Sequence, residues 1–259
     1  MIAELASLGL DFPRWQDALE AAHASGALQV SGEVRDGQVL QYDDPSGARL
    51  IILAVEPYGA FAGLYGGISA TGHISMVNDV VGVIDVVADS PELQTSGQSA
   101  PVVASVTASV AQGPSMADAA TLEYQQLQIA ALGVDVATFD SPAAFASAGG
   151  GELGVVESAG MADLNSGARA PHAGARIAVE ATDVVKRTNA LTGQDFWLAT
   201  VQQPFEFTVA LPASAIAAPP APGHPLIVSG TVHMTATAVE AAGCSPGGCG
   251  SGACGCGGH

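Results

Sequence analysis

Short segments in which apolar, often β-branched residues alternate with polar ones recur along this chain of 259 residues, and turn residues separate them. A period of two is typical of β-strands with one buried face, and an Asp-Gly pair between two such segments is a strong hairpin signal. Aromatic residues make up only 5% of the chain, which indicates sheets packed with small side chains. We therefore expect a mainly β fold with a minor N-terminal helix.

Periodic segments occur along the whole chain, and the pattern is cleaner from Ala175 onward. Phe12, Trp15 and Leu19 recur at helical spacing before Gly26, which predicts a helix that Trp15 anchors to a sheet. A meander of strands at 27–34, 38–42 and 49–55, with a turn at Asp36-Gly37, is expected next. Further strands are predicted at 74–88, 102–111, 123–139, 176–185, 196–201, 205–211 and 226–239. A short helix is predicted at 141–148 and a loop or linker at 149–174. The segment 74–88 also fits a helical projection, but its Val and Ile content favours a strand.

Charge divides the chain unevenly. Residues 1–167 hold 20 acidic side chains against three arginines, whereas residues 168–240 hold five acidic against four basic side chains. Such a break is evidence for a domain boundary. We predict an acidic helix-plus-sheet domain at 1–148, a linker at 149–174, a small barrel domain at 175–240 and a flexible tail at 241–259.

The barrel expectation comes with a resemblance. The order of segments from Ala175 onward is similar to that of an OB-type or Greek-key barrel. It consists of a strand, a Thr-Gly loop within Arg187–Gln194, the strand Phe196–Val201, a further strand ending before Pro212 and a long closing strand. The same segment resembles a family of actinobacterial mainly β proteins with an OB-like C-terminal part. No activity is attached to that family, so the resemblance implies a fold and no functional residues.

The four cysteines of the chain all lie within its last sixteen residues, among glycines. With a terminal histidine they form the spacing C-x4-C-x4-C-x-C-x2-H, through Cys244, Cys249, Cys254, Cys256 and His259. Thiolate and imidazole are the ligands that Zn²⁺ and Cu(I) prefer. The spacing differs from zinc knuckles and iron–sulfur runs, so we expect a disordered tail that captures a soft metal and not a rigid structural site. A low-complexity terminus without a task, or a redox role, is the alternative.

No catalytic constellation can be assembled from the sequence. The segment 149–154 satisfies G-x-G-x-x-G, but no strand is expected before it, and neither a P-loop nor a G-x-S-x-G elbow occurs. Asp43 and Asp44 fit a turn, and His73 and His233 fit ordinary strand positions better than a shared metal site. We expect a protein that is not an enzyme, although a site formed between domains stays open.

An oligonucleotide-binding barrel is a further alternative. Phe196, Trp197, Phe205 and Phe207 would supply stacking, and Arg176, Lys186 and Arg187 would contact phosphates. Alternation assigns Phe205 and Phe207 to the core and points Trp197 outward. The net charge of −18 disfavours nucleic acid and anionic lipid as partners.

The leading hypothesis is a soluble, cytoplasmic, non-catalytic protein that binds zinc or copper through its tail. The first residues carry no basic segment with an apolar run, so no secretion signal is expected, and no apolar run is long enough for a membrane helix. The rival hypothesis is a structural or interaction module without metal, whose sheets form a homo-oligomer.

Overall fold

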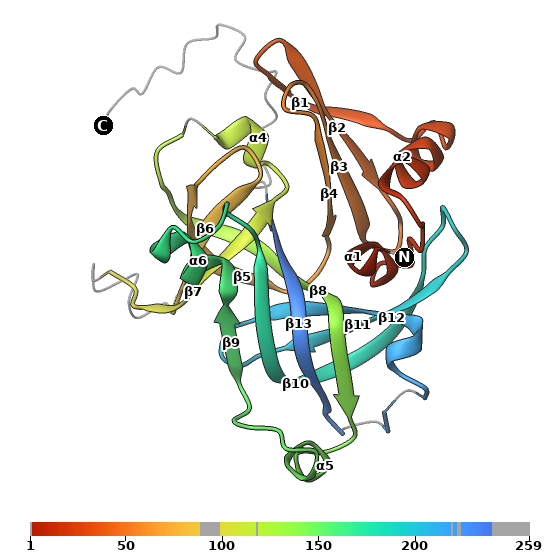
Figure 1. Ribbon diagram of the computed structural model, residues 1–259, viewed down its shortest axis with the longest axis vertical. Coiled ribbons are helices and arrows are strands. Elements are labelled where there is room, and N and C mark those ends of the chain that lie inside the picture. The colour runs from red at the N-terminus through yellow and green to blue at the C-terminus, as the bar shows by residue number, and fades with distance from the viewer. Residues whose placement is uncertain (1, 89–98, 118, 219, 222–223, 240–259) are drawn as a thin grey trace, which may run out of the picture.

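A computed structural model describes residues 2–88, 99–117, 119–218, 220–221 and 224–239, and it confirms the mainly β fold (Figure 1). Its strands are β1 (Gln29–Val34), β2 (Gly37–Asp43), β3 (Ala48–Ala54), β4 (Gly59–Leu64), β5 (Ser69–Met76), β6 (Val81–Val87), β7 (Val102–Val110), β8 (Leu122–Phe139), β9 (Val155–Ser158), β10 (Gly174–Thr188), β11 (Asp195–Val201), β12 (Phe207–Pro212) and β13 (Leu226–Ala238). Its helices are α1 (Ala3–Ala6), α2 (Trp15–Ala24), α4 (Gly113–Met116), α5 (Pro142–Ser147), α6 (Ala159–Ser166) and the short 3₁₀ turn η1 (Ala213–Ala215).

The strands β1 to β4 form an antiparallel meander. Its first three strands were predicted, whereas β4 was not. The tight turn between β1 and β2 consists of Arg35 and Asp36, one residue before the predicted Asp36-Gly37 pair, because Gly37 already pairs with Val34. The predicted helix is α2, which buries Ala18 and Ala22 against a cluster that also contains Leu50 of β3. Trp15 packs against the same cluster, so its predicted anchoring role is confirmed. Figure 1 shows α2 beside this sheet.

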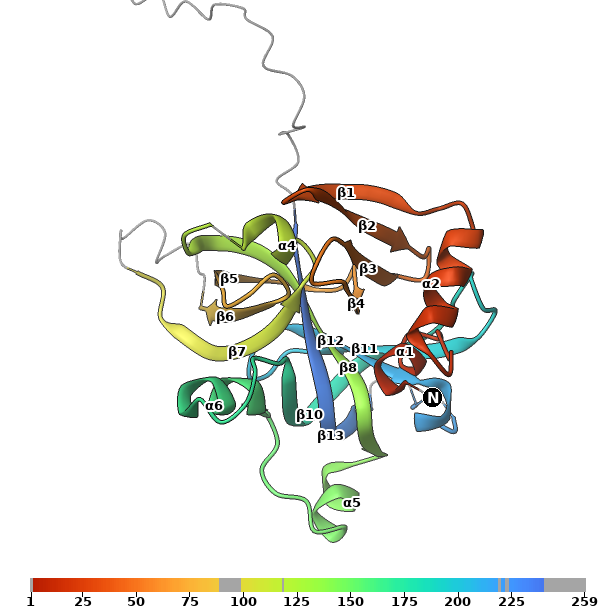
Figure 2. The same cartoon turned by 45° about the horizontal axis from the view of Figure 1, so that its top comes forward.

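Eight of the other nine strands form two closed rings that share β8 and β13, and among the described strands β9 pairs only with β10. These two strands pair antiparallel along most of their length. One ring continues from β13 through β7, β6 and β5 back to β8, and the other continues through β10, β11 and β12 back to β8. Closure leaves few unpaired strand edges, because each ring returns to its starting strand. In Figure 2 the four-stranded sheet lies above the rings and α5 projects below them.

One continuous apolar cluster fills the rings. It draws small and branched side chains from both, among them Val106 of β7, Leu127 of β8, Val179 of β10 and Met234 of β13. A second cluster covers the outer face of β8, where Leu5 of α1 and Leu8 just after this helix pack in the same cluster as Leu132 of β8. Residues 129–132 of β8 are thus buried on both faces, and none of them is charged.

The segment 74–88 is not one strand but parts of two. Residues 77–80 form a turn between β5 and β6, in which the Asn78 carboxamide oxygen accepts hydrogen bonds from the amides of Val80 and Val81. An Asn side chain that bonds to the backbone two residues ahead is a frequent turn former, and Asn78-Asp79 was the signal for it.

The segment 149–174 also differs from the loop that we predicted, because it contains β9 and α6. β9 adds an edge strand to β10, and α6 packs beside β7 and β10. Neither element shows much apolar periodicity, because α6 consists mainly of small residues that fit close to the sheet.

The strands of the predicted barrel at 175–240 close a ring only together with β8, which precedes the predicted linker. The ring therefore contains one strand more than the OB-like segment alone. The division into domains at 148 and 175 stays a prediction about folding units, and an unfolding experiment that tests it is described below.

None of the helices in the described part of the chain has the length and apolar character needed to cross a membrane.

Candidate functional site

The five predicted metal ligands, Cys244, Cys249, Cys254, Cys256 and His259, lie outside the described residues. The chain leads into them from β13, whose last residue is firmly held. The Ala238 amide donates to the Gln112 side chain at 3.0 Å, and the Gln112 side-chain amide donates back to the Ala238 carbonyl at 3.0 Å. The next amide, that of Val239, donates to the Gln126 carbonyl at 2.8 Å.

Within the described ranges, no group of three or more His, Cys, Asp or Glu side chains is placed to hold a metal ion. His73 and His233 do not meet. The ring of His73 accepts a hydrogen bond from the Tyr124 amide and contacts the Tyr124 ring edge-on, with the ring centres 4.7 Å apart. His233 lies on β13 and forms a hydrogen bond with Ser109 of β7. The two histidines therefore contact different residues and do not form a shared metal site.

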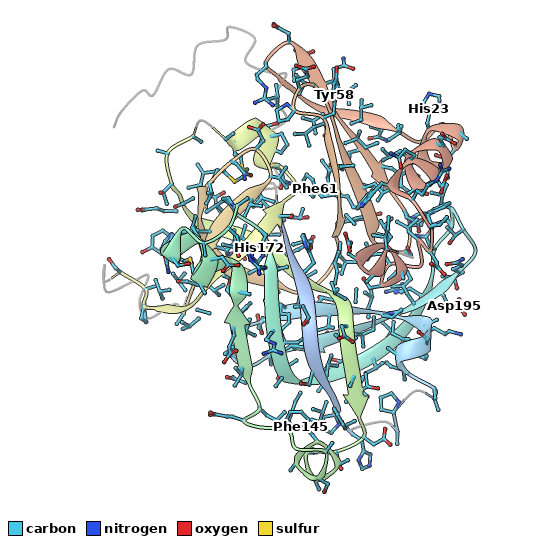
Figure 3. The ribbon with its side chains drawn as sticks, viewed as in Figure 1. His23, Tyr58, Phe61, Phe145, His172 and Asp195 are labelled. Atoms are coloured by element: carbon cyan, nitrogen blue, oxygen red, sulfur yellow. The ribbon has the colours of Figure 1, made fainter. Side chains whose placement is uncertain are left out.

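A pocket of about 250 Å³ lies where β4, β6, β7 and β13 meet the N-terminal helices, and we call it the His233 pocket. Its polar lining consists of Glu4, Ser109, His172 and His233. Its apolar lining includes Trp15 and Phe61. Phe61 and His172, both labelled in Figure 3, come from elements far apart in the sequence.

The polar groups of the His233 pocket are ordered by three hydrogen bonds. Ser109 Oγ and His233 Nε2 are 2.9 Å apart. His172 Nε2 lies 2.8 Å from Asp163 Oδ2, and His172 Nδ1 accepts a hydrogen bond from the Gly174 amide. His172 thus uses both ring nitrogens within the protein.

His233 is held in its neutral form by its surroundings. Burial lowers the pKa of its imidazole, the Glu4 carboxylate raises it by a smaller amount, and His172 lowers it further. A neutral imidazole can accept a hydrogen bond from a ligand. The sequence offered no signal for this arrangement, because Ser109 and His233 are 124 residues apart.

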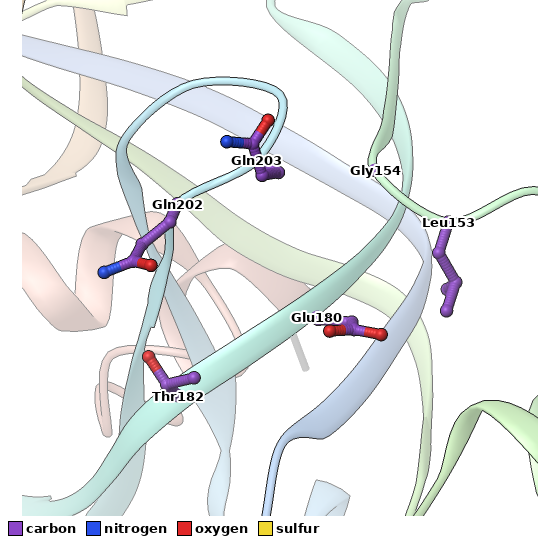
Figure 4. A pocket seen from close by; sticks show the side chains of 6 residues that line it. All are labelled: Leu153, Gly154, Glu180, Thr182, Gln202 and Gln203. Carbon is purple, nitrogen blue, oxygen red and sulfur yellow. The ribbon is translucent and has the colours of Figure 1, made fainter.

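A second pocket of about 310 Å³ is lined by Leu153, Gly154, Glu180, Thr182, Gln202 and Gln203 (Figure 4). Glu180 and Thr182 come from β10, and the two glutamines follow β11. The carboxylate and the amides are exposed, and the lining contains no histidine or cysteine. This pocket can offer hydrogen bonds to a polar ligand, and Glu180 is the one titratable side chain in its described lining.

Asp44 occupies the turn that we predicted, yet its carboxylate is fully buried. It accepts hydrogen bonds from the Tyr42 hydroxyl, the Ser46 hydroxyl and amide, and the amides of Ala190 and Leu191. Burial alone would raise the pKa of this carboxyl, but the donors from Ser46, Ala190 and Tyr42 outweigh burial and hold the pKa below its usual value. The pKa of Tyr42 is raised, mainly by burial and then by Asp44.

The prediction that Trp197 points outward was wrong. Trp197 is buried in the ring core, and its Nε1 donates to the Ala213 carbonyl. Its neighbour Phe196 is buried on the other face, against the cluster that contains Leu5. Both faces of β11 are covered, so alternation could not select an exposed residue. Phe205 and Phe207 lie in the core as expected, and the four aromatics offer no stacking surface.

The basic side chains of the same segment are not gathered toward a ligand. Lys186 forms an ion pair with Asp195 at 2.6 Å. Arg176 and Arg187 are exposed on β10. The G-x-G-x-x-G segment follows α5 and precedes β9, which is the reverse of the strand-then-helix order that a dinucleotide site needs.

No family model matches the chain, and neither a curated protein nor a solved structure matches it. The resemblance to an actinobacterial family stays a prediction. Function is therefore argued from the residues of this chain alone.

Proposed function

We propose that the protein binds a soft transition metal ion, Zn²⁺ or Cu(I), through Cys244, Cys249, Cys254, Cys256 and His259. The observation that supports this proposal is the placement of all four cysteines within the last sixteen residues, together with a histidine. Four thiolates and an imidazole exceed the four ligands of a tetrahedral zinc site and the two or three that suffice for Cu(I).

The described part of the chain supports a protein in which the tail binds the metal and the folded body carries the tail. It holds no cluster of three or more potential ligands, so the tail is where binding must be tested. The reciprocal Gln112–Ala238 hydrogen bonds fix the point from which the tail begins. The folded body thus acts as a carrier or docking module for a metal-capturing end, without catalysis. Free thiols require a reducing compartment such as the cytoplasm.

Competition titration against a chromophoric chelator tests the proposal. The reduced full-length protein is titrated with Zn²⁺ and with Cu(I), beside a variant in which all four cysteines are serine. His23→Ala, in an exposed position on α2, is the matched control. We expect at least one tightly bound ion per chain in the wild type and in His23→Ala, and loss of that ion in the serine variant. Equal binding by the serine variant would remove the proposal.

A second candidate, an interaction module that assembles with itself, is favoured by β1. This strand is at the edge of the four-stranded sheet, and Val30 on it is 55% exposed. An exposed edge strand is a template for pairing with a second chain. Light scattering of the wild type and of Val30→Lys tests it: a dimer that the substitution converts to a monomer supports it, and a monomeric wild type contradicts it.

A further inference from the structure

The His233 pocket combines features that point to a ligand, and it has no part in the proposed metal site. Its wall is assembled from five separate regions: α1 and α2, β4, the β6–β7 pair, residues 171–173 and β13. With about 250 Å³, it has room for about eight non-hydrogen atoms at the ~30 Å³ that one water molecule occupies in the liquid. This is smaller than the usual drug-sized site.

Glu4 is the most informative residue of the lining. Its side chain is half-buried, and its carboxylate has no hydrogen-bond or ion-pair partner among the described residues. Taking a carboxylate partly out of water without a partner is unfavourable. No lysine or arginine lines the pocket, so the chain itself does not neutralise this charge there.

The two histidines play different parts. His172 is committed to Asp163 and Gly174 and presents only its ring to the pocket. His233 shares Nε2 with Ser109, and its Nδ1 has no partner within the described part of the chain. The free nitrogen is available to a ligand donor.

A further polar group lies unsatisfied beside the pocket. Thr235 is on the same face of β13 as His233 and is the β-sheet partner of Ser109. Its hydroxyl oxygen is buried, and no described residue gives it a hydrogen-bond partner. Buried hydroxyls normally have a hydrogen-bond partner. The Thr235 hydroxyl therefore leaves one hydrogen bond unmade next to Ser109 and His233.

We propose that the His233 pocket binds a small organic ammonium ion, with its charged end at Glu4 and His233 and its apolar body against Trp15 and Phe61. A cation neutralises the Glu4 carboxylate and donates to the neutral imidazole. The face of an indole ring attracts cations as well. The strongly negative chain draws cationic ligands toward it.

Other ligand classes fit less well. An anion would meet the Glu4 carboxylate with no lysine or arginine in the described lining to offset the repulsion. A neutral ligand would bury the Glu4 carboxylate further without pairing it. A metal ion would lack a third ligand, because no group of three potential ligands is assembled among the described residues.

Three probes of similar size and different charge test the proposal on the full-length protein: benzylammonium, benzyl alcohol and benzoate. The experiment is run at about pH 7 with EDTA present, so that metal bound elsewhere cannot contribute. Binding is followed by calorimetry and by Trp15 fluorescence in a Trp197→Phe background, where Trp15 is the remaining tryptophan. We expect saturable binding of benzylammonium, about tenfold weaker binding of benzyl alcohol, and none of benzoate.

Two variants locate the site. Glu4→Gln should weaken benzylammonium about tenfold and leave benzyl alcohol unchanged, whereas Glu20→Gln, exposed on α2, should change neither. Equal affinity for the three probes, or an unchanged benzylammonium affinity in a folded Glu4→Gln protein, would overturn the proposal. If Glu4→Gln does not fold, the relative affinities of the wild-type protein for the three probes test the proposal. The variant with four serines in place of the cysteines should bind benzylammonium as the wild type does, because the His233 pocket does not include the proposed metal ligands. This result would distinguish the ammonium proposal from the metal proposal.

Discussion

Asp44 joins parts of the chain that are distant in sequence. Its carboxylate accepts from Tyr42 and Ser46 in its own hairpin and from the amides of Ala190 and Leu191 in the loop after β10. The same loop is tied to the N-terminal segment, because the Asn189 side chain donates to the Leu8 carbonyl. One buried carboxylate thus couples the four-stranded sheet to the rings.

Replacing Asp44 by alanine should therefore destabilise the protein strongly. The substitution leaves the amides of Ala190 and Leu191 and the Tyr42 hydroxyl without their acceptor in a buried place. We expect a loss of about 2–4 kcal/mol in the free energy of unfolding. Urea denaturation measures it, with Asp36→Ala in the exposed β1–β2 turn as the control. A loss below about 0.5 kcal/mol, the size expected of the control, would show that the network contributes little.

The same carboxylate should make stability depend on pH. Its pKa is lower in the folded chain than in the unfolded chain, so in the acid range the folded state binds fewer protons than the unfolded state. The contribution is complete above the unfolded Asp pKa of about 3.9 and disappears as pH falls through the lower folded value. The stability gap between wild type and Asp44→Asn should therefore shrink between about pH 5 and pH 2. A gap that grows toward acid would contradict the assignment.

At this scale the sequence reveals the local role of a residue but not its distant contacts. The Asp44-Pro45-Ser46-Gly47 pattern predicted the turn correctly, because turn chemistry is local. The contact of Asp44 with Ala190 spans 146 residues, and the Ser109–His233 contact spans 124. Such contacts depend on which strands pair, and periodicity carries no information about pairing partners.

The elements themselves were predictable where their periodicity was strong. β8, β10 and β13 were predicted with nearly correct bounds, and Val and Thr are frequent in β10 and β13. α6 was missed, although Ser158 caps its first turn and Gly167 ends it in the left-handed region, with φ +65°. A Ser and a Gly that enclose eight mostly small residues were the available signal.

The close fit of α6 against β7 makes a prediction at this scale. A Cβ atom built on Gly160 would lie 1.9 Å from the His172 carbonyl oxygen and 2.2 Å from the Thr107 hydroxyl. Gly160→Ala should therefore displace α6 and cost about 1–3 kcal/mol by overpacking.

Thermal unfolding of Gly160→Ala beside Gly151→Ala makes the comparison. Gly151 has no atom within 4 Å of the added Cβ, so its substitution should leave the melting temperature nearly unchanged. Equal melting temperatures of the two variants would show that α6 does not pack against the sheet as described.

For the whole molecule, the shared strands β8 and β13 link the two rings. Unfolding one ring would strip a partner from both shared strands of the other, so we expect one cooperative transition for the described body. Single-tryptophan variants report on its two sides, with Trp15 on α2 and Trp197 in β11. Their fluorescence transitions in urea should coincide.

The same experiment tests the domain division predicted from charge. If 1–148 and 175–240 were independent folding units, Trp15 and Trp197 would report separate midpoints. The balance of acidic and basic residues does change at residue 167. Charged side chains lie mainly at the surface, however, so their distribution does not reveal that β8 pairs with β13. The mainly β class was predictable from the sequence, whereas ring closure was not, because it depends on pairing between distant strands.

Metal capture by the tail is a property of the whole chain, and native mass spectrometry of the reduced full-length protein tests it most directly. After exposure to Zn²⁺ or Cu(I) and removal of the excess, we predict a mass that exceeds the polypeptide by at least one metal ion. The variant with serine at 244, 249, 254 and 256 should show the bare polypeptide. A wild-type spectrum that contains only bare polypeptide after exposure to both ions would contradict the proposed function.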